Sequence, residues 1–250
     1  MKIIVDQLVV NYSITGKGKT ILLLHGWGDD IRTFAKLRQE LDKDYQTVAL
    51  DLPGFGASQA PKEVWGLDDY ANFIAHFLKK LELTSYAIIG HSNGGALAIR
   101  GLATGKIKSD KLVLIAAAGI RNKNGLKKFS TKVVAKTGKA ATFWLPNDYK
   151  QRLRKRLYGT IGSDLLVMPH LEETFKKTVR QDVQKDAAAL SLPTLLIFAD
   201  RDPAIPLEDG KTYHELIKQS ELKVLKSSDH FVHHDQPGSV LKLIKEFLQC

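Results

Sequence analysis

Short, continuously apolar segments alternate along this chain with longer segments in which apolar residues recur every three or four positions. The segments 20–26 (TILLLHG), 86–92 (YAIIGHS) and 194–200 (TLLIFAD) are rich in Ile, Leu and Val. Such runs are typical of strands that are buried on both faces, as the strands of parallel sheets are. The alternation therefore predicts the α/β class, with a doubly wound, mostly parallel sheet that carries helices on both faces.

The same patterns place the individual elements. Strands are predicted over 8–15, 20–26, 47–54, 86–92, 111–119, 194–200 and 222–226. The first of these alternates apolar and polar residues more than the others, which is typical of an antiparallel edge strand. Helices are predicted over 31–41, 67–81, 95–104 and 239–248, where the apolar spacing would give each helix one buried face.

Residues 120–189 interrupt this alternation. They are basic and mostly compatible with helix, and glycines and prolines break them up before the strand pattern resumes. The simplest interpretation is a helical insertion between two neighbouring strands of the sheet. The sequence therefore predicts an α/β core over 1–119 and 190–250, and a basic helical lid over 120–189.

The net charge of +10 is concentrated in this insertion. Between residues 119 and 190 the chain has sixteen Lys and Arg residues and six Asp and Glu residues, so the whole excess lies there. One interpretation is solubility, and the other is a basic surface that steers an acidic partner or substrate towards the lid. A nucleic-acid-binding module is disfavoured, because the segment has no recognisable binding motif and few interleaved aromatic residues.

The sequence also carries indications of location. No apolar run approaches the roughly 20 residues that span a bilayer, and the first ten residues (MKIIVDQLVV) lack the apolar core of a secretory signal. The single cysteine, Cys250, excludes an internal disulfide. These features predict a cytoplasmic protein without a transmembrane segment.

The segment Gly90–Gly94 (GHSNG) places Ser92 in the pattern G-x-S-x-G, between a predicted strand and a predicted helix. A sharp turn in this position lifts a serine side chain out of the sheet edge, and the flanking glycines leave room for the turn. The alternative is a small polar residue in a tight turn. Ser92 is therefore a candidate nucleophile whose role depends on a base and an acid elsewhere.

Candidates for both follow later strands. A serine nucleophile needs a base to take its proton and a carboxylate to orient that base. The strand over 194–200 leads to Asp200 and Asp202, and the last strand leads to three histidines: His230, His233 and His234. These positions agree with the chain order Ser, acid, His, and with ligand sites at the carboxyl ends of parallel strands.

On these motifs the chain resembles α/β-hydrolase-fold proteins of the lid-bearing serine carboxylesterase type, including methyl ester esterases that act on acyl-carrier proteins. The matching segments are HGWGDD (25–30), DLPGFGAS (51–58), GHSNGG (90–95), DRDPAIP (200–206) and DHFVHHDQP (229–237). The resemblance implies an eight-stranded sheet with the lid after the sixth strand, and a triad of Ser92, Asp202 and His230. Ala199 and Asp229 depart from it, since the family usually has glycine at both positions.

The resemblance also implies an oxyanion hole made by the backbone N–H groups of Trp27 and Asn93. Trp27, His91 and Phe231 are the predicted substrate-contacting residues, with the indole of Trp27 as a wall of the acyl pocket. The resemblance further suggests structural hydrogen bonds for His91, and a loop-shaping role for His233 and His234. For three remote histidines, His76, His170 and His214, catalysis is not expected.

The function implied is two-step acyl transfer to a small ester with a short- to medium-chain acyl group, without metal or organic cofactor. Alternatives within the fold are an esterase or thioesterase for acyl chains on an acidic carrier protein, a lactonase, and a carbon–carbon bond hydrolase. The last is disfavoured because Phe231 and Val232 follow the histidine, where such enzymes often carry a tryptophan nearby. A slow-turnover, receptor-like binding protein also retains this fold and triad, and is an alternative from another class.

Overall fold

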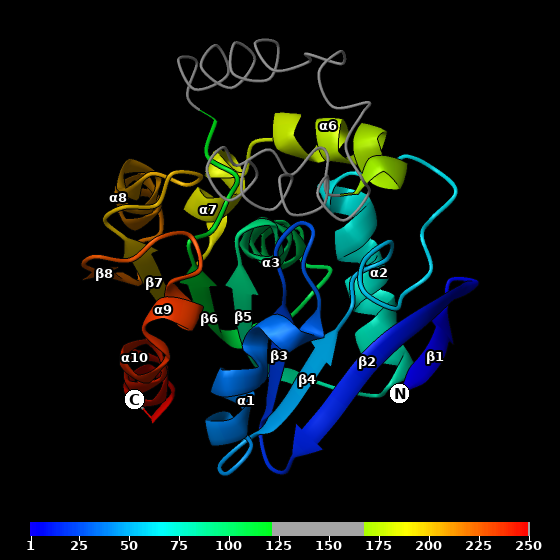
Figure 1. Cartoon of the computed structure of the whole chain (residues 1–250), viewed down its shortest axis with the longest axis horizontal. Helices are drawn as coiled ribbons and strands as arrows, with labels where there is room; N and C mark the ends of the chain where they lie inside the picture. Colours follow the sequence, from blue (N-terminus) through cyan, green and yellow to red (C-terminus); the bar gives the residue numbers. More distant parts are fainter. Residues whose placement is uncertain (122–167, 250) are drawn as a thin grey trace, which may run out of the picture.

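The computed structural model describes residues 1–121 and 168–249, which fold around an eight-stranded sheet with helices on both faces (Figure 1). The strands are β1 (Lys2–Val5), β2 (Leu8–Gly16), β3 (Thr20–Leu24), β4 (Gln46–Leu50), β5 (Ser85–His91), β6 (Ser109–Ile115), β7 (Thr194–Ala199) and β8 (Ser220–Leu225). Their order across the sheet is β1-β2-β4-β3-β5-β6-β7-β8. Every pair from β4 to β8 is parallel, whereas β1–β2 and β2–β4 are antiparallel. The predicted fold class is confirmed. The predicted strand over 8–15 is antiparallel to its neighbours, as expected, but it is not the edge, because β1 lies outside it.

Strand β1 was not among the predicted strands. It has only four residues and pairs with β2 through a two-residue turn at Asp6 and Gln7, whose φ angles are +48° and +64°. Two consecutive positive φ angles are what a tight hairpin of this kind requires, and they usually fall on Asn-Gly or Asp-Gly. Asp-Gln is a weak turn signal, so the sequence did not predict this hairpin.

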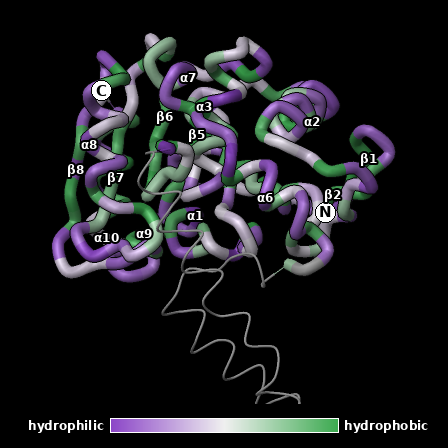
Figure 2. Tube along the Cα trace, turned by 90° about the horizontal axis from the view of Figure 1, so that it is seen from above, coloured by the Kyte–Doolittle hydropathy of each residue, from purple (hydrophilic) through white to green (hydrophobic). Residues whose placement is uncertain are grey.

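The helices divide between the two faces of the sheet. On one face lie α2 (Leu67–Lys80), α3 (Asn93–Ala103), α7 (Gln184–Ala189) and α8 (Leu207–Leu216). On the other lie η1 (Ile31–Phe34), α1 (Ala35–Leu41), α9 (Val232–Asp235) and α10 (Pro237–Gln249). Figure 2 shows α2, α3 and α7 on one side of the strands, and α1 and α10 on the other.

The core follows the two-residue period of the strands. In β3, Leu22 and Leu24 pack against the α2 and α3 face, whereas Ile21 and Leu23 pack against the α1 and α10 face. All four side chains are fully buried. Because both faces of a central strand are covered, the strand is apolar throughout, which is the pattern that the sequence shows.

Part of the predicted lid is described. Residues 122–167 lie outside the described residues, and the lid over 120–189 as a unit stays a prediction. Its later part forms η3 (Pro169–Leu171), α6 (Glu172–Arg180) and α7. Helix α6 is docked on the loop before α2, where Trp65 N donates to Thr174 Oγ1 (3.2 Å) and Leu67 N donates to Gln181 Oε1 (2.7 Å). Across the described residues, no helix is long and apolar enough to cross a membrane.

Candidate active site

Ser92 lies in the turn between β5 and α3, with φ +50° and ψ −118°. A non-glycine residue in this region is strained, and such strain concentrates at functional sites. The flanking glycines are required by contact: a Cβ on Gly94 would lie 2.1 Å from the Leu24 carbonyl oxygen, and one on Gly90 would lie 2.7 Å from the Gly95 Cα. The G-x-S-x-G pattern is thus a packing requirement of this turn.

His230 and Asp202 meet Ser92 at the carboxyl ends of the strands. The Nε2 of His230 is 3.0 Å from Ser92 Oγ, and Nδ1 is 2.7 Å from Asp202 Oδ2. The Asp202 side chain has no solvent exposure, and its other oxygen accepts hydrogen bonds from the backbone N–H groups of Ala204 (2.7 Å) and Ile205 (2.9 Å). The carboxylate is therefore fixed, and it holds the ring with Nδ1 donating and Nε2 facing the serine.

The structure places the other candidate acid and histidines elsewhere. Asp200 Oδ1 accepts a hydrogen bond from Ser227 N (2.7 Å). The Nε2 atoms of His233 and His234 both lie 3.1 Å from Thr33 Oγ1. Asp229, one of the two departures from the family pattern, accepts from Phe231 N (2.9 Å) within its own loop. Neither departure separates the acid from the base.

The loop after β3 passes directly beside Ser92. A Cβ on Gly26 would lie 3.1 Å from Ser92 Cβ. His25 fixes this loop: its Nδ1 donates to the Gly26 carbonyl (2.7 Å), and its Nε2 accepts from Leu52 N (2.9 Å). Burial lowers the pKa of His25, so the ring remains neutral in this tautomer.

Trp27, in this loop, and Asn93 are the predicted oxyanion donors. Asn93 is the first residue of α3, where backbone N–H groups have no acceptor within the helix. The Trp27 ring is 8% exposed and lies 4.9 Å from the ring of Phe55 and 5.0 Å from that of Phe175 in α6. The indole therefore packs between an aromatic ring of the core and one of α6, and its role as a wall of the acyl pocket stays a prediction. The oxyanion role stays a prediction.

His91 and Phe231 contact His230. The Nε2 of His91 donates to the His230 carbonyl oxygen (3.1 Å), and the two rings are 4.9 Å apart. Burial lowers the pKa of His91 well below its usual value, so this ring is a neutral donor. Phe231 is 39% exposed and lies edge-on to His230 at 5.4 Å. His91 thus makes a structural hydrogen bond, and substrate contact by either residue stays a prediction.

Thr33 is a residue that the sequence did not identify. It belongs to η1, and through His233 and His234 it joins the segment after the Trp27 loop to the loop that carries His230. A threonine in an amphipathic segment carries no signal for this role, because its partners lie about two hundred residues away. Only the fold brings the two loops together.

His233 should make the protein sensitive to acid. Burial, with a smaller contribution from His234 and His230, lowers its pKa to about 3, against 6.5 unperturbed. Below pH 6.5 the unfolded chain therefore binds a proton that the folded chain does not. As the pH is lowered from 6.5, the free energy of unfolding decreases by up to about 1.4 kcal/mol per pH unit. Urea unfolding at pH 7, 6, 5 and 4 should show a shallower loss in His233→Asn. The exposed His214, changed to Asn, is the matched control, and equal slopes in both variants would contradict the prediction.

Asp209, in α8, should make the protein less stable as the pH rises through the acidic range. Burial raises the pKa of its carboxyl to about 6; the Arg121 guanidinium opposes this shift, and the Glu208 and Asp202 carboxylates add to it. The folded state thus holds a proton more tightly than the unfolded state, and stability is lost as pH rises from about 4 through about 6. Asp209→Asn should gain about 2 kcal/mol at pH 8 and little at pH 4, measured by denaturant unfolding. Glu215→Gln, an exposed acid in the same helix that does not contribute to this shift, serves as the control, and an equal gain of Asp209→Asn at both pH values would contradict the cause.

The described residues hold no group of three or more His, Cys, Asp or Glu side chains placed to bind a metal ion. The chemistry that this arrangement can perform is attack by Ser92 Oγ on an electrophilic carbon, with the imidazole of His230 moving the proton. That a cofactor is not required stays a prediction.

Comparisons with known proteins identify the family and support the fold. Residues 19–237 match the alpha/beta hydrolase fold family. AB hydrolase superfamily protein YisY of Bacillus subtilis is 28% identical, over 93% of this chain and 92% of its own. The 2-hydroxy-6-oxo-2,4-heptadienoate hydrolase of Pseudomonas putida is 25% identical, over 98% of this chain and 95% of its own. An esterase from Exiguobacterium antarcticum shares the fold, with a TM-score of 0.78 at 20% identity, covering 100% of this chain and 99% of that one. Because the family model covers most of the chain, the protein belongs to the α/β-hydrolase family and is supported as a hydrolase of that family.

Proposed function

We propose that the protein is a serine carboxylesterase that hydrolyses small carboxylic esters with short- to medium-chain acyl groups. The observation that carries this proposal is the continuous hydrogen-bonded path from Ser92 Oγ through the His230 ring to Asp202. It gives a serine hydroxyl, which is barely nucleophilic at neutral pH, both a base and an orienting acid.

The reaction proceeds in two steps. His230 Nε2 takes the proton of Ser92 as Oγ attacks the ester carbonyl, and the resulting oxyanion is held by the backbone N–H groups of Trp27 and Asn93. The protonated His230, stabilised by the carboxylate of Asp202, then donates the proton to the leaving alkoxide. A water molecule hydrolyses the acyl-enzyme by the same route, and Ser92 is regenerated.

A second candidate, hydrolysis of a carbon–carbon bond, is favoured by one observation. The Pseudomonas putida relative is named for 2-hydroxy-6-oxo-2,4-heptadienoate, a keto acid. Against this candidate, the exposed Phe231 follows His230, where enzymes that hydrolyse carbon–carbon bonds often carry a tryptophan nearby. This difference favours ester hydrolysis over carbon–carbon bond hydrolysis.

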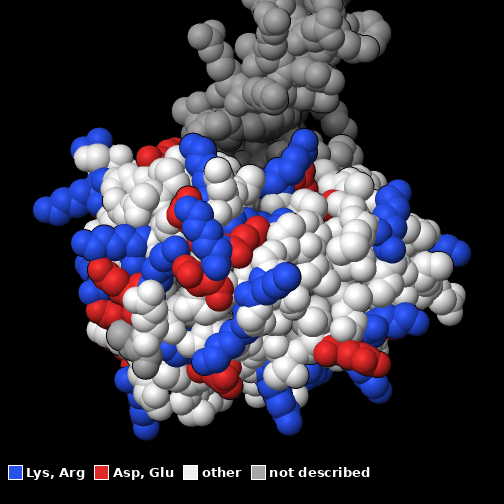
Figure 3. Space-filling view, turned by 90° about the horizontal axis from the view of Figure 1, so that it is seen from below, with Lys and Arg blue, Asp and Glu red and all other residues white. Residues whose placement is uncertain are grey.

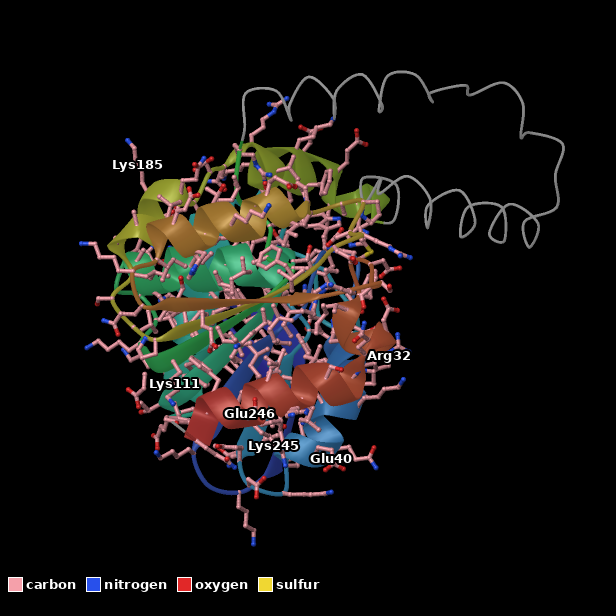
Figure 4. The ribbon with its side chains drawn as sticks, turned by 90° about the vertical axis from the view of Figure 1, so that its left-hand side faces the viewer. Arg32, Glu40, Lys111, Lys185, Lys245 and Glu246 are labelled. Carbon is pink, nitrogen blue, oxygen red and sulfur yellow. The ribbon has the colours of Figure 1, made fainter. Side chains whose placement is uncertain are left out.

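A third candidate, an ester on an acidic carrier protein, depends on the basic insertion. In its described part, Lys176 pairs with Glu172 (2.8 Å) and Glu173 (2.7 Å), and Lys177 pairs with Asp69 (3.1 Å). Lys185 points away from the molecule (Figure 4). Basic and acidic side chains are interspersed on the face at the amino ends of the parallel strands (Figure 3). Most of the basic residues of the insertion belong to 122–167, outside the described residues. If a carrier-bound ester is the substrate, charge-neutralising changes at four of them should slow only its turnover: Lys127, Lys128, Arg154 and Arg156.

The test uses the full chain with p-nitrophenyl acetate and butyrate, and with 2-hydroxy-6-oxo-2,4-heptadienoate. We expect ester turnover well above background and faster than cleavage of the keto acid. A fluorophosphonate that reacts with activated serines should inactivate the enzyme and add one phosphonyl group to the peptide that contains Ser92. Absence of ester turnover, or labelling of a different serine, would contradict the proposed function.

A further inference from the structure

The side chain of Asn93 leaves a hydrogen-bond donor without a partner beside the proposed nucleophile. Asn93 follows Ser92 directly and is the first residue of α3. Its Nδ2 is buried from solvent and donates to none of the residues that the structure describes. A buried amide N–H without an acceptor carries an uncompensated desolvation cost, and native proteins keep few such groups.

Trp27 repeats this arrangement in the other loop of the site. Its ring is more than nine-tenths buried, and its indole Nε1–H also has no acceptor among residues 1–121 and 168–249. The two residues whose backbone amides form the proposed oxyanion hole thus each carry an additional unpaired donor. A plain hydrocarbon acyl chain would leave both donors unsatisfied, whereas a chain that bears oxygen supplies an acceptor.

The position of Asn93 limits where that oxygen lies. In the proposed mechanism its backbone N–H binds the oxygen of the reacting carbonyl. Because the side-chain amide belongs to the same residue, we infer that the acceptor it takes lies near the reacting carbonyl, on a carbon one or two bonds away. On the alcohol side of the ester, by contrast, lies His230, which must approach the leaving oxygen to protonate it.

Resting on the proposed esterase function, we propose that the Asn93 side-chain amide donates a hydrogen bond to a second oxygen on the α or β carbon of the acyl group. The preferred substrates are therefore esters of alkoxy, hydroxy or keto acids rather than of plain alkanoic acids. Asn93 acts as a specificity-determining residue in addition to its backbone contribution to the oxyanion hole.

Two isosteric esters test this assignment. p-Nitrophenyl methoxyacetate and p-nitrophenyl butyrate have acyl groups of the same length and differ by one ether oxygen in place of a methylene. Their kcat/KM ratio is measured for the wild type and for Asn93→Leu, so that the intrinsic reactivity of the methoxy ester and any general loss of activity cancel. We expect the ratio to fall about tenfold in Asn93→Leu, equivalent to about 1.4 kcal/mol of lost selectivity.

A second variant protects the test against misfolding. Asn93→Asp has the same shape but replaces the donor by a carboxylate oxygen, which repels the ether oxygen, so the ratio should fall at least as far. The matched control is Phe175→Leu, which replaces the ring packed against Trp27 without removing a hydrogen-bond donor, and it should keep the wild-type ratio. A ratio within twofold of the wild type in both Asn93 variants, or an equal fall in Phe175→Leu, would overturn the proposal.

Failure of the esterase function gives a different result. In that case neither ester is turned over in a Ser92-dependent way, and no ratio can be formed. If both esters are hydrolysed through Ser92 and the ratio is insensitive to Asn93, the esterase function stands and only the role of the Asn93 amide fails.

Discussion

Ser92→Ala should lower kcat for p-nitrophenyl acetate by about 10⁶-fold, close to the loss seen when a serine nucleophile of this kind is removed. The Oγ atom makes the 3.0 Å contact with His230 Nε2, and no other atom of residue 92 can form the acyl-enzyme. A residual acceleration of about 10³-fold over water is expected, because the oxyanion donors and the binding pocket remain.

This variant should fold normally. The backbone oxygen of Ser92 accepts hydrogen bonds from Gly95 N (3.0 Å) and Ala118 N (3.0 Å), and its N–H donates to the Ile115 carbonyl (3.0 Å). Alanine keeps all of these contacts. Steady-state kinetics with purified protein, together with a thermal melt within a few degrees of the wild type, checks the result. Ester hydrolysis that survives the substitution would exclude Ser92 as the nucleophile.

Asp202→Asn should lower kcat by about 10⁴-fold while leaving the site geometry intact. One oxygen of Asp202 is held by the N–H groups of Ala204 and Ile205. An asparagine that keeps these two bonds must turn its NH₂ group towards His230 Nδ1. The ring then has to accept at Nδ1 and carry its proton on Nε2, where it can no longer take the proton of Ser92.

Asp200→Asn and Asp229→Asn are the matched controls for this prediction. Their carboxylates accept hydrogen bonds from Ser227 N and Phe231 N, and neither bonds to the His230 ring. Both variants should retain kcat within about tenfold of the wild type, since they affect only the loops. A loss in Asp229→Asn as large as that in Asp202→Asn would mean that Asp202 is not the orienting acid.

The sequence predicted the architecture well because its central strands are buried on both faces. A strand such as β3, with every side chain buried, must be apolar at every position, and this makes it visible without a structure. Strand β1 escaped because it is short and exposed at the edge, where Ile4 is 62% exposed and packing places little demand on the side chains. Helix α3 begins at Asn93 rather than at Gly95, because the turn at Ser92 leads directly into it.

Part of the candidate site could also be predicted from the sequence, because close packing restricts which residues fit there. Gly90 and Gly94 have no room for a side chain, so the elbow leaves its mark on the sequence. The residues that hold His230 in place are not restricted to one small residue type, so they leave no comparable pattern in the sequence. Thr33 bonds to the histidine loop, yet in the sequence it looks like an ordinary member of an amphipathic helical segment, and His91 was singled out only through the family resemblance.

The sequence by itself determined the order of strands and helices, the strained position of Ser92, and the set of acids and histidines that reach the same edge of the sheet. From the residues alone, two aspartates and three histidines remained possible, and only the family resemblance favoured Asp202 and His230. The tertiary structure alone brings that pair to Ser92 and turns the others away. The physical reason is distance along the chain: His230 and Ser92 are 138 residues apart. Their 3.0 Å contact depends on parallel strands ending at a common edge, which no local pattern of residues encodes.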